Sequence, residues 1–225
     1  MTYSICATDG ECHGVAIATK APAVGSLAPC LSRNGVVSTQ ATVNIPLGVV
    51  AKRLLDRGAS VDHAVASVLR QEDDPDVRQI HGVDRNGNTT VHSGENCVEW
   101  FGSRVGNGYT VAGNMLSGER VVEAIAETFE EAADNPLAER LLAAIEAGEA
   151  AGGDKRAPNA QSTAIKIYDP TGPKVCHDVR VDDHDDPVAE LRRVYKLAKA
   201  KDEEWGDREP GMVLQRNPPL DGDWG

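Results

Sequence analysis

Residues 1–20, MTYSICATDGECHGVAIATK, predict a β-hairpin that begins at the second residue of the chain. Tyr3, Ile5 and Ala7 alternate with Ser4 and Cys6, as expected for a strand with two different faces. The dipeptide DG at positions 9–10 is a strong turn signal. The stretch HGVAIAT then returns as a second strand of small residues, so a sheet forms early in the chain.

The length of the turn decides which residue faces Thr2. Two registers fit the sequence, and they place Thr2 opposite either Thr19 or Ile17. In both registers Lys20 lies within one to three residues of the facing position. At ~3.4 Å per residue, its flexible side chain can approach the threonine.

A threonine at the start of a mature chain carries its own base. Its α-amine has an ordinary pKa of about 7.7–8.0 and lies beside its own hydroxyl. Removal of Met1 is expected because the second residue is small, and it would expose Thr2 as such a residue. A nearby Lys20 ammonium would lower the pKa of the amine and stabilise the attacking oxygen. The alternatives are that Thr2 only opens a strand and that Lys20 is a surface lysine.

The rest of the chain alternates between strands and paired helices. Helices are predicted over residues 46–57, from Ser60 as N-cap through Gln71, over 118–132, over 136–147 and from Asp186 onward. Strands are predicted from Asn34, around the NG turn at 86–87, over 108–114, and as a pair over 161–169 and 174–182. Asp185 or Asp186 is expected to cap the last helix.

Hairpins between neighbouring strands favour antiparallel sheets with helices outside them. Two such sheets packed face to face give a four-layer α/β/β/α sandwich of the α+β class, although periodicity alone also permits a two-layer α+β domain. Length and composition predict one domain over residues 1–203, followed by a tail rich in proline and glycine over 204–225.

Composition excludes several classes of partner. The formal net charge of −12 would repel nucleic acid and anionic lipid. No segment has the length of a membrane span or the pattern of a signal peptide, so we expect a cytoplasmic protein without a membrane partner.

The five cysteines contain no CxxC pair, so they predict neither a disulfide framework nor a zinc site with cysteine ligands. In HDVRVDDHDD (177–186), alternation along a strand spreads the acidic side chains apart, so they do not converge on one metal ion. They are better explained as the cap of the following helix. We therefore expect no bound metal, and we also expect no cofactor.

Several segments together resemble a known family. They are residues 1–26, VVSTQATVN (36–44), GYTVAGNML (108–116), AAGGDKR (150–156), AQSTA (160–164) and VRVDDHDDPVAELRRVY (179–195). In this order they resemble the domain of unknown function 1028 family over roughly residues 2–197. That family is placed in the Ntn-hydrolase-like superfamily, in which an N-terminal residue is the nucleophile. The resemblance therefore implies the four-layer sandwich and an amidohydrolase activity.

The resemblance also assigns residues to the family's positions. Thr2 matches the nucleophile position and Lys20 the end of the strand paired with it. Polar motif positions fall on Gln40, Asn44, Asn114, Asp154, Arg156, Gln161 and Ser162, and we expect the six other than Asn114 to bind substrate. Lys155 and the following APNAQST depart from the family's pattern of two arginines and a glycine, which weakens the case for a bidentate carboxylate clamp.

The chemistry of amide hydrolysis gives three of these residues specific roles. Attack on an amide places negative charge on its carbonyl oxygen, which Asn114 could stabilise with its side-chain amide. Asp154 could hold Lys20 or the free amine. The alternatives are a turn role for Asn114 and a solvated loop at GGDKR (152–156).

Two functions follow from these observations. The first is an N-terminal-nucleophile hydrolase of a small amide, ureide or short peptide, with Thr2, Lys20 and Asn114 as its catalytic residues. The second is a catalytically inactive protein of the same fold that binds a small polar ligand. We expect a homo-oligomer in either case, because a pocket at a sheet edge is often completed by a second subunit.

Overall fold

A computed structural model gives the structure of the chain and describes residues 1–156, 159–172 and 174–206. Within these residues the strands form two antiparallel sheets. The six-stranded sheet has the order β10-β9-β2-β1-β8-β7, and the four-stranded sheet has the order β3-β4-β5-β6. The strands are β1 (Thr2–Thr8), β2 (His13–Thr19), β3 (Pro29–Ser32), β4 (Gly35–Ala41), β5 (Arg78–Asp84), β6 (Thr89–Ser93), β7 (Gly102–Gly106), β8 (Tyr109–Asn114), β9 (Ser162–Tyr168) and β10 (Asp178–Val181).

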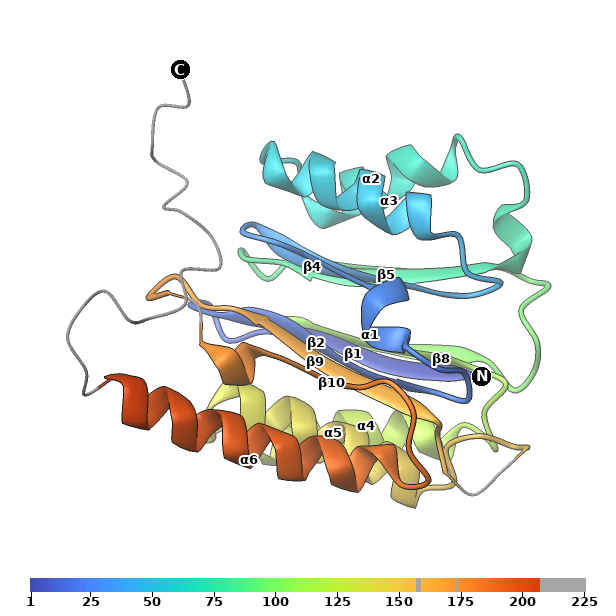
Figure 1. Cartoon of the computed structure of the whole chain (residues 1–225). Coiled ribbons are helices and arrows are strands. Elements are labelled where there is room, and N and C mark those ends of the chain that lie inside the picture. The colour runs from blue at the N-terminus through green and yellow to red at the C-terminus, as the bar shows by residue number, and fades with distance from the viewer. Residues whose placement is uncertain (157–158, 173, 207–225) are drawn as a thin grey trace.

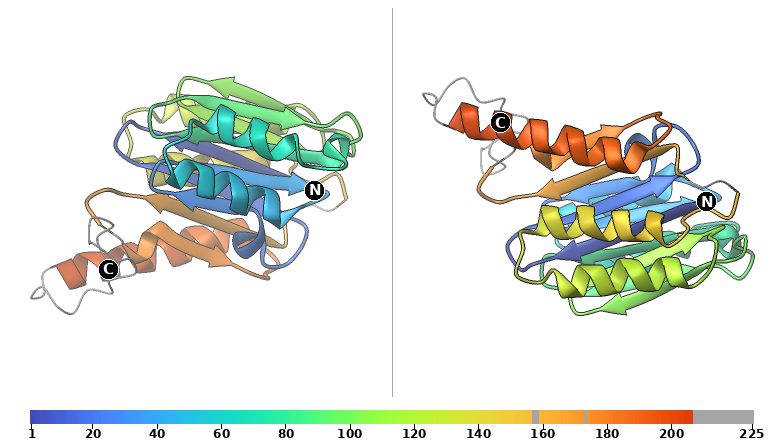
Figure 2. Two further views of the ribbon diagram at one scale, coloured as in Figure 1. Left: turned by 90° about the horizontal axis from the view of Figure 1, so that it is seen from above. Right: turned by 90° about the horizontal axis from the view of Figure 1, so that it is seen from below.

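Helices cover the outer face of each sheet (Figures 1 and 2). The four-stranded sheet is covered by α2 (Ile45–Asp56) and α3 (Val61–Leu69), and the six-stranded sheet by α4 (Arg120–Glu131), α5 (Leu137–Ala150) and α6 (Pro187–Gly206). The short helix α1 (Val24–Leu27) and the 3-10 turns η1 (Pro75–Val77) and η2 (Val175–His177) complete the order. The predicted four-layer α/β/β/α sandwich is confirmed. None of the helices in the described residues is long and apolar enough to cross a lipid bilayer.

Strand β1 lies in the middle of the larger sheet and is buried on both faces. Tyr3 and Ile5 belong to the apolar cluster between this sheet and its helices. Ser4 and Cys6 face the other sheet, where Cys6 packs against Val36 and Val83. Each large apolar side chain buried in this way contributes roughly 1.5–3 kcal/mol to the free energy of unfolding. The alternation predicted for residues 3–7 is therefore confirmed.

One glycine allows helix α5 to approach the larger sheet closely. A Cβ atom at Gly148 would lie 2.7 Å from the Ile125 side chain and 3.3 Å from the Tyr3 ring. The absence of a side chain therefore lets α5 pack against β1 and α4 at this point. This packing fixes the depth of β1 beneath the helices.

Helix boundaries agree with the sequence to within a few residues, but one cap differs. The Ser60 side chain makes no capping hydrogen bond to α3. Instead, Asp84 at the end of β5 accepts a hydrogen bond of 3.2 Å from the backbone N–H of Val61. The cap of α6 is as expected, because Asp186 accepts a hydrogen bond of 3.2 Å from the Ala189 N–H.

Several elements differ from the sequence prediction. Strands β3 and β7 and helix α1 lie where no regular structure was predicted, because short edge elements have weak periodicity. The strand predicted over 174–182 is shorter, since η2 occupies residues 175–177 and β10 begins at Asp178. Helix α6 runs to Gly206, so residues 204–206 of the expected tail are helical. The rest of that tail lies outside the described residues.

Candidate active site

The hairpin places Thr2 between two strands at one end of the larger sheet. Thr2 pairs with Thr19 on β2 and with Asn114 on β8. The predicted register that places Thr2 opposite Thr19 is therefore confirmed, and the alternative that places it opposite Ile17 is wrong. Thr2 is only 9 % exposed. Strand pairing on both sides holds this residue in a fixed position.

A hydroxyl pair fixes the proton of Thr2. The Thr2 and Thr19 Oγ1 atoms lie 3.0 Å apart. Thr19 also donates a hydrogen bond to the Met1 carbonyl oxygen. A carbonyl can only accept, and a hydroxyl has one proton to donate. Thr2 is therefore the donor of the pair, and its proton points toward the Thr19 oxygen.

The terminal amine occupies a partly buried, positively charged environment. The Met1 nitrogen donates to the Met115 sulfur at 3.0 Å. Burial, with a further contribution from the Arg156 charge, lowers the pKa of this amine to about 6. Because consecutive Cα atoms are ~3.8 Å apart, the amine of a chain that began at Thr2 would lie close to this environment. An amine with a lowered pKa is largely unprotonated at neutral pH and can accept a proton.

A cavity of about 190 Å³ opens beside Thr2. Thr2, Thr19 and Lys20 from the hairpin contribute to its wall, as do Met1 and Arg156. The loop after β2, helix α1 and strand β4 supply mainly apolar lining, which comes from Ala21, Pro22, Val24, Leu27, Ala28, Ala41 and Val43. The hydroxyl of Thr2 therefore has access to a small space with apolar walls and two cations.

Lys20 lies on the cavity wall without a carboxylate partner. Its Nζ atom donates to the Asn159 carbonyl oxygen at 2.9 Å. It forms no ion pair with any residue in the described part of the chain. An ammonium group can donate three hydrogen bonds. Lys20 therefore has spare hydrogen-bond donors beside the cavity.

Asp154 pairs with Arg156 and not with Lys20, whereas the sequence had suggested Lys20 or the free amine as its partner. Its carboxylate accepts hydrogen bonds from the Arg156 backbone N–H at 2.7 Å and from the guanidinium Nη2 at 2.8 Å. Burial raises the pKa of Asp154, but the hydrogen bonds with Arg156 outweigh it and leave the pKa below its ordinary value. The ionised Asp154 carboxylate also acts on the Met1 amine through its charge.

Asn114 and Gln40 belong to a polar layer between the sheets. The side-chain amides of Asn114 and Gln40 both donate to the Gln79 carbonyl oxygen, at 3.0 and 2.7 Å. Gln40 also contributes to the cavity wall, whereas Asn114 does not. Gln40 accepts a hydrogen bond of 2.8 Å from Ser4. With Met1 in place, the Asn114 amide donates its hydrogen bond to the Gln79 side chain, and Asn114 does not line the cavity.

The other three expected residues lie outside the cavity lining. Asn44 donates to Glu72 at 2.6 Å, and Gln161 donates to Asp183 at 2.9 Å. Ser162 donates to the Ala21 carbonyl at 2.5 Å and accepts from the Val24 N–H. Ser162 therefore anchors the loop that forms part of the cavity wall. Of the nine expected site residues, the cavity brings together Thr2, Lys20, Gln40 and Arg156.

Sequence reasoning missed the role of Thr19 and the partners of the polar layer. The signal for Thr19 was available, because one of the two registers already placed it opposite Thr2. His81 had no such signal, since its contacts with Ser4 at 2.7 Å and Thr110 at 2.9 Å join two different sheets. Among the described residues, no group of three or more histidine, cysteine, aspartate or glutamate side chains could hold a metal ion.

Comparison with solved structures finds similar ones that cover nearly the whole chain. Protein SPO2555 from Silicibacter pomeroyi, a DUF1028 protein, superimposes with a TM-score of 0.81 at 29 % identity, covering 93 % of this chain and 94 % of that one. Anbu from Yersinia bercovieri aligns with a TM-score of 0.42 at 13 % identity, over 94 % of this chain and 99 % of its own.

No curated protein matches the sequence. The model of the family of unknown function DUF1028 matches residues 2–191. These residues include the hairpin that carries Thr2 and Thr19 and the loop that carries Asp154 and Arg156. The chain therefore belongs to the DUF1028 family.

Proposed function

We propose that this protein is an N-terminal-nucleophile amidohydrolase whose mature chain begins at Thr2. The observation that carries the proposal is the position of Thr2, whose hydroxyl lies beside a cavity and donates to Thr19. The lowered pKa of the partly buried Met1 amine supports it, because the amine of a chain that began at Thr2 would lie close to the same environment. Loss of Met1 would leave an amine and a hydroxyl on the same residue at the cavity wall.

The reaction would use this amine as its base. The Thr2 hydroxyl oxygen attacks the substrate carbonyl carbon, and its proton passes to the α-amine. The C–N bond then breaks, the leaving amine takes that proton, and the acyl group remains on Thr2 as an ester. Water attacks the ester carbonyl, the α-amine again takes a proton, and the acid is released as Thr2 regains its hydroxyl.

The space that Met1 fills supports a small acyl group as the substrate. Met1 is 7 % exposed and belongs to the apolar cluster beneath the larger sheet. Its removal would join this apolar space to the 190 Å³ cavity. Lys20, a cation without a carboxylate partner, would bind an anionic group elsewhere on the substrate. The proposed substrates are therefore small amides, ureides or short peptides that carry a carboxylate.

Intact-mass spectrometry tests the proposal directly. The purified protein is expected to lack Met1 and to gain the mass of a β-lactone, with the adduct mapped to Thr2. Thr2→Ala should abolish the adduct while still allowing removal of Met1, and Thr2→Ser should retain it. Thr42→Ala, at an exposed position near the cavity, is the matched control. Retention of Met1, or an adduct that persists in Thr2→Ala, would contradict the proposal.

One observation favours the second function, an inactive binding protein. Asn114, expected to stabilise the oxyanion, donates to Gln79 and does not line the cavity. A hydrolase converts its substrate into products, whereas an inactive binding protein leaves its ligand intact. A panel of N-acetyl amino acids incubated with the protein should release acetate if Thr2 is a nucleophile. Saturable binding without release, equal in the parent and Thr2→Ala proteins, would favour the binding function.

The expected homo-oligomer stays a prediction. Val43, Ile45 and Val50 are large apolar side chains with exposed fractions of 44, 37 and 39 %. Val43 also lines the cavity. If a second copy completes the site, replacing Val43 and Ile45 with serine should lower the molar mass measured by light scattering.

A further inference from the structure

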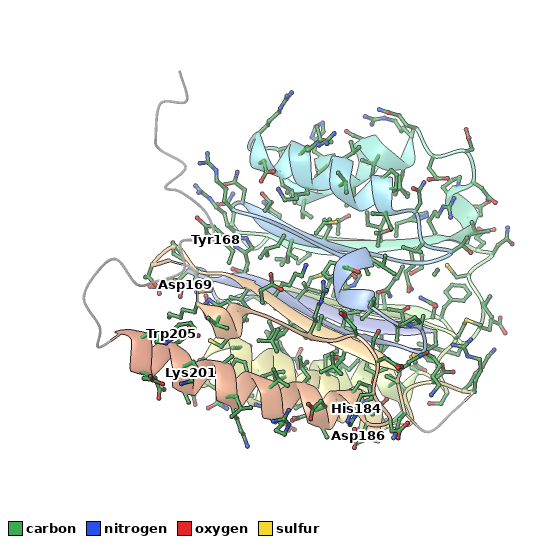
Figure 3. All side chains as sticks on the ribbon, viewed as in Figure 1. Tyr168, Asp169, His184, Asp186, Lys201 and Trp205 are labelled. Atoms are coloured by element: carbon green, nitrogen blue, oxygen red, sulfur yellow. The ribbon has the colours of Figure 1, made fainter. Side chains whose placement is uncertain are left out.

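A second and larger cavity is lined by Asp169 and Trp205, which lie in Figure 3 at the opposite end of the molecule from the chain start marked in Figure 1. Its volume is about 550 Å³, within the usual range for small-molecule sites. Figure 3 labels Asp169 and Trp205, which both line it. The end of α6, the turn η2, the β1–β2 hairpin and the start of α5 surround it. The proposed reaction at Thr2 makes no use of this cavity.

Helix α6 forms one wall because its inner face continues past the sheet. Leu191, Tyr195 and Ala198 follow each other along that face and are buried. Asp202 continues the row and accepts hydrogen bonds from the Val175 and Cys176 N–H groups of η2, at 2.7 and 2.9 Å. The contact fixes the end of α6 at a distance from the sheet. The space left between them is the cavity.

The wall carries polar atoms that lack partners. Tyr195 is 3 % exposed and lines the cavity, yet its hydroxyl makes no hydrogen bond with any described residue. The buried Nδ1 atom of His177, another lining residue, also has no hydrogen-bond partner in that part of the chain. Buried polar groups are normally hydrogen-bonded. Their presence on the wall of a cavity points to a ligand that supplies the missing partners.

The charges around the cavity favour a cation. The acidic lining residues are Asp9, Asp169, Asp202 and Glu203, and the basic ones are Lys174 and Lys199. Lys174 is already paired with Asp169 at 3.0 Å, and Lys199 lies 3.9 Å from Glu139. Neither Asp9 nor Glu203 forms an ion pair among the described residues. Burial, with a further contribution from the Lys174 charge, lowers the pKa of His177, which favours its neutral form.

The remaining wall is apolar and aromatic. Leu137, Ile167 and Val175 contribute aliphatic surface, and Trp205 joins Tyr195 as a second aromatic ring. Aromatic rings attract organic cations through the negative face of their π-systems. We propose that this cavity binds an organic cation in which a primary ammonium group is attached to a flat apolar body. The Tyr195 hydroxyl oxygen accepts from the ammonium, and Asp9 and Glu203 balance its charge.

Calorimetric titration of the full chain tests the proposal with three compounds of similar size. The probes are phenethylamine, phenethyl alcohol and 3-phenylpropanoate at pH 7. A charge-assisted hydrogen bond contributes enough to give a preference of about tenfold or more for the amine. Binding of phenethylamine in preference to the other two supports the proposal. No binding of the amine, or equal affinity for all three compounds, would overturn it.

Matched variants locate the site. Tyr195→Phe removes the hydroxyl and keeps the ring, so phenethylamine should bind about tenfold more weakly. Tyr168→Phe is the control, because it removes a hydroxyl from a residue outside the lining. Glu203→Gln should weaken the binding of phenethylamine and leave the binding of phenethyl alcohol unchanged. Equal affinity in the parent and Tyr195→Phe proteins contradicts the assignment, as does a matching loss in Tyr168→Phe. Thr2→Ala should bind the amine normally, so failure of the hydrolase proposal would leave this result unaffected.

Discussion

The hydroxyl groups of Thr2 and Thr19 lie 3.0 Å apart across the β1–β2 pair, and Thr2 is the donor. Loss of Met1 would remove the carbonyl to which Thr19 donates. The Thr19 hydroxyl would then be free to turn toward the new amine. In a chain that begins at Thr2, Thr19 would therefore be placed to pass the Thr2 proton to that amine.

Thr19→Val tests this role because it keeps the shape of the side chain and removes the hydroxyl. We expect the rate of β-lactone addition to Thr2 to fall by about tenfold or more. Thr19→Ser restores the hydroxyl and should restore the rate. The measurement is the time course of adduct mass in proteins confirmed to lack Met1. Equal rates for the valine and serine variants would contradict a role for the hydroxyl.

Arg156 should set the pH dependence of the reaction. Burial is the largest cause that lowers the pKa of the Met1 amine; the Arg156 charge lowers it further, and the Asp154 carboxylate raises it. Arg156→Gln removes the cation and leaves the Asp154 carboxylate in place, so the pKa of the amine should rise. The alkaline-rising limb of the adduct rate should therefore move to higher pH. Arg156→Lys keeps the charge and should move it less. A limb that stays in place in the glutamine variant would exclude this electrostatic role.

Lys20 should select for anionic substrates. It is a cation on the cavity wall without a carboxylate partner among the described residues. Lys20→Met should raise KM for an N-acetyl amino acid about tenfold or more and leave KM for the corresponding neutral amide unchanged. Lys20→Arg retains the charge and serves as the control. A loss of kcat for both substrates in Lys20→Met would instead indicate a catalytic role.

Gln79 should contribute strongly to stability because it connects the two sheets. It is fully buried, accepts from Gln40 and Asn114, and donates to Ser93 and Gly113. Gln79→Leu leaves two buried donors without their acceptor, which should lower the free energy of unfolding by about 3 kcal/mol. Urea denaturation measures this change. Gln71→Leu, at an exposed position, should change it by less than about 0.5 kcal/mol.

His81 should make the protein less stable in mild acid. Ser4 donates to Gln40, so it accepts from the Nε2–H of His81, while the Nδ1 atom accepts from Thr110. Burial lowers the pKa of His81 to about 3 from an ordinary value of 6.5. The unfolded chain therefore binds more protons between these values, and stability falls as the pH falls below about 6.5.

The effect is measured as the difference in unfolding free energy between pH 7 and pH 5. His81 alone should account for about 2 kcal/mol of the loss over this interval. His81→Gln should reduce the loss by that amount, whereas His63→Gln, at an exposed helix position, should not. An identical pH dependence in the parent and His81→Gln proteins would contradict the prediction.

The sequence by itself determined the position of Thr2 at the start of a hairpin and favoured antiparallel sheets with helices outside them, but its periodicity left both a two-layer and a four-layer arrangement open. Alternation over residues 3–7 and the DG turn are local signals, and they predicted the hairpin with its two registers. The long amphipathic helices were also predicted, because their periodicity extends over several turns. Short elements such as β7 and η2 were not, since they depend on contacts with neighbouring strands.

Only the tertiary structure decided which polar residues share a site. Strand pairing selected Thr19 as the partner of Thr2, and packing of the two sheets turned Asn114 toward Gln79 and away from the cavity. Packing of the end of α6 and the turn η2 beside the larger sheet created the larger cavity, which lies between segments about 200 residues apart in the sequence, such as Asp9 and Trp205. The physical reason is that a hydrogen-bond partner is chosen by distance in space, and local sequence patterns carry no information about such distances.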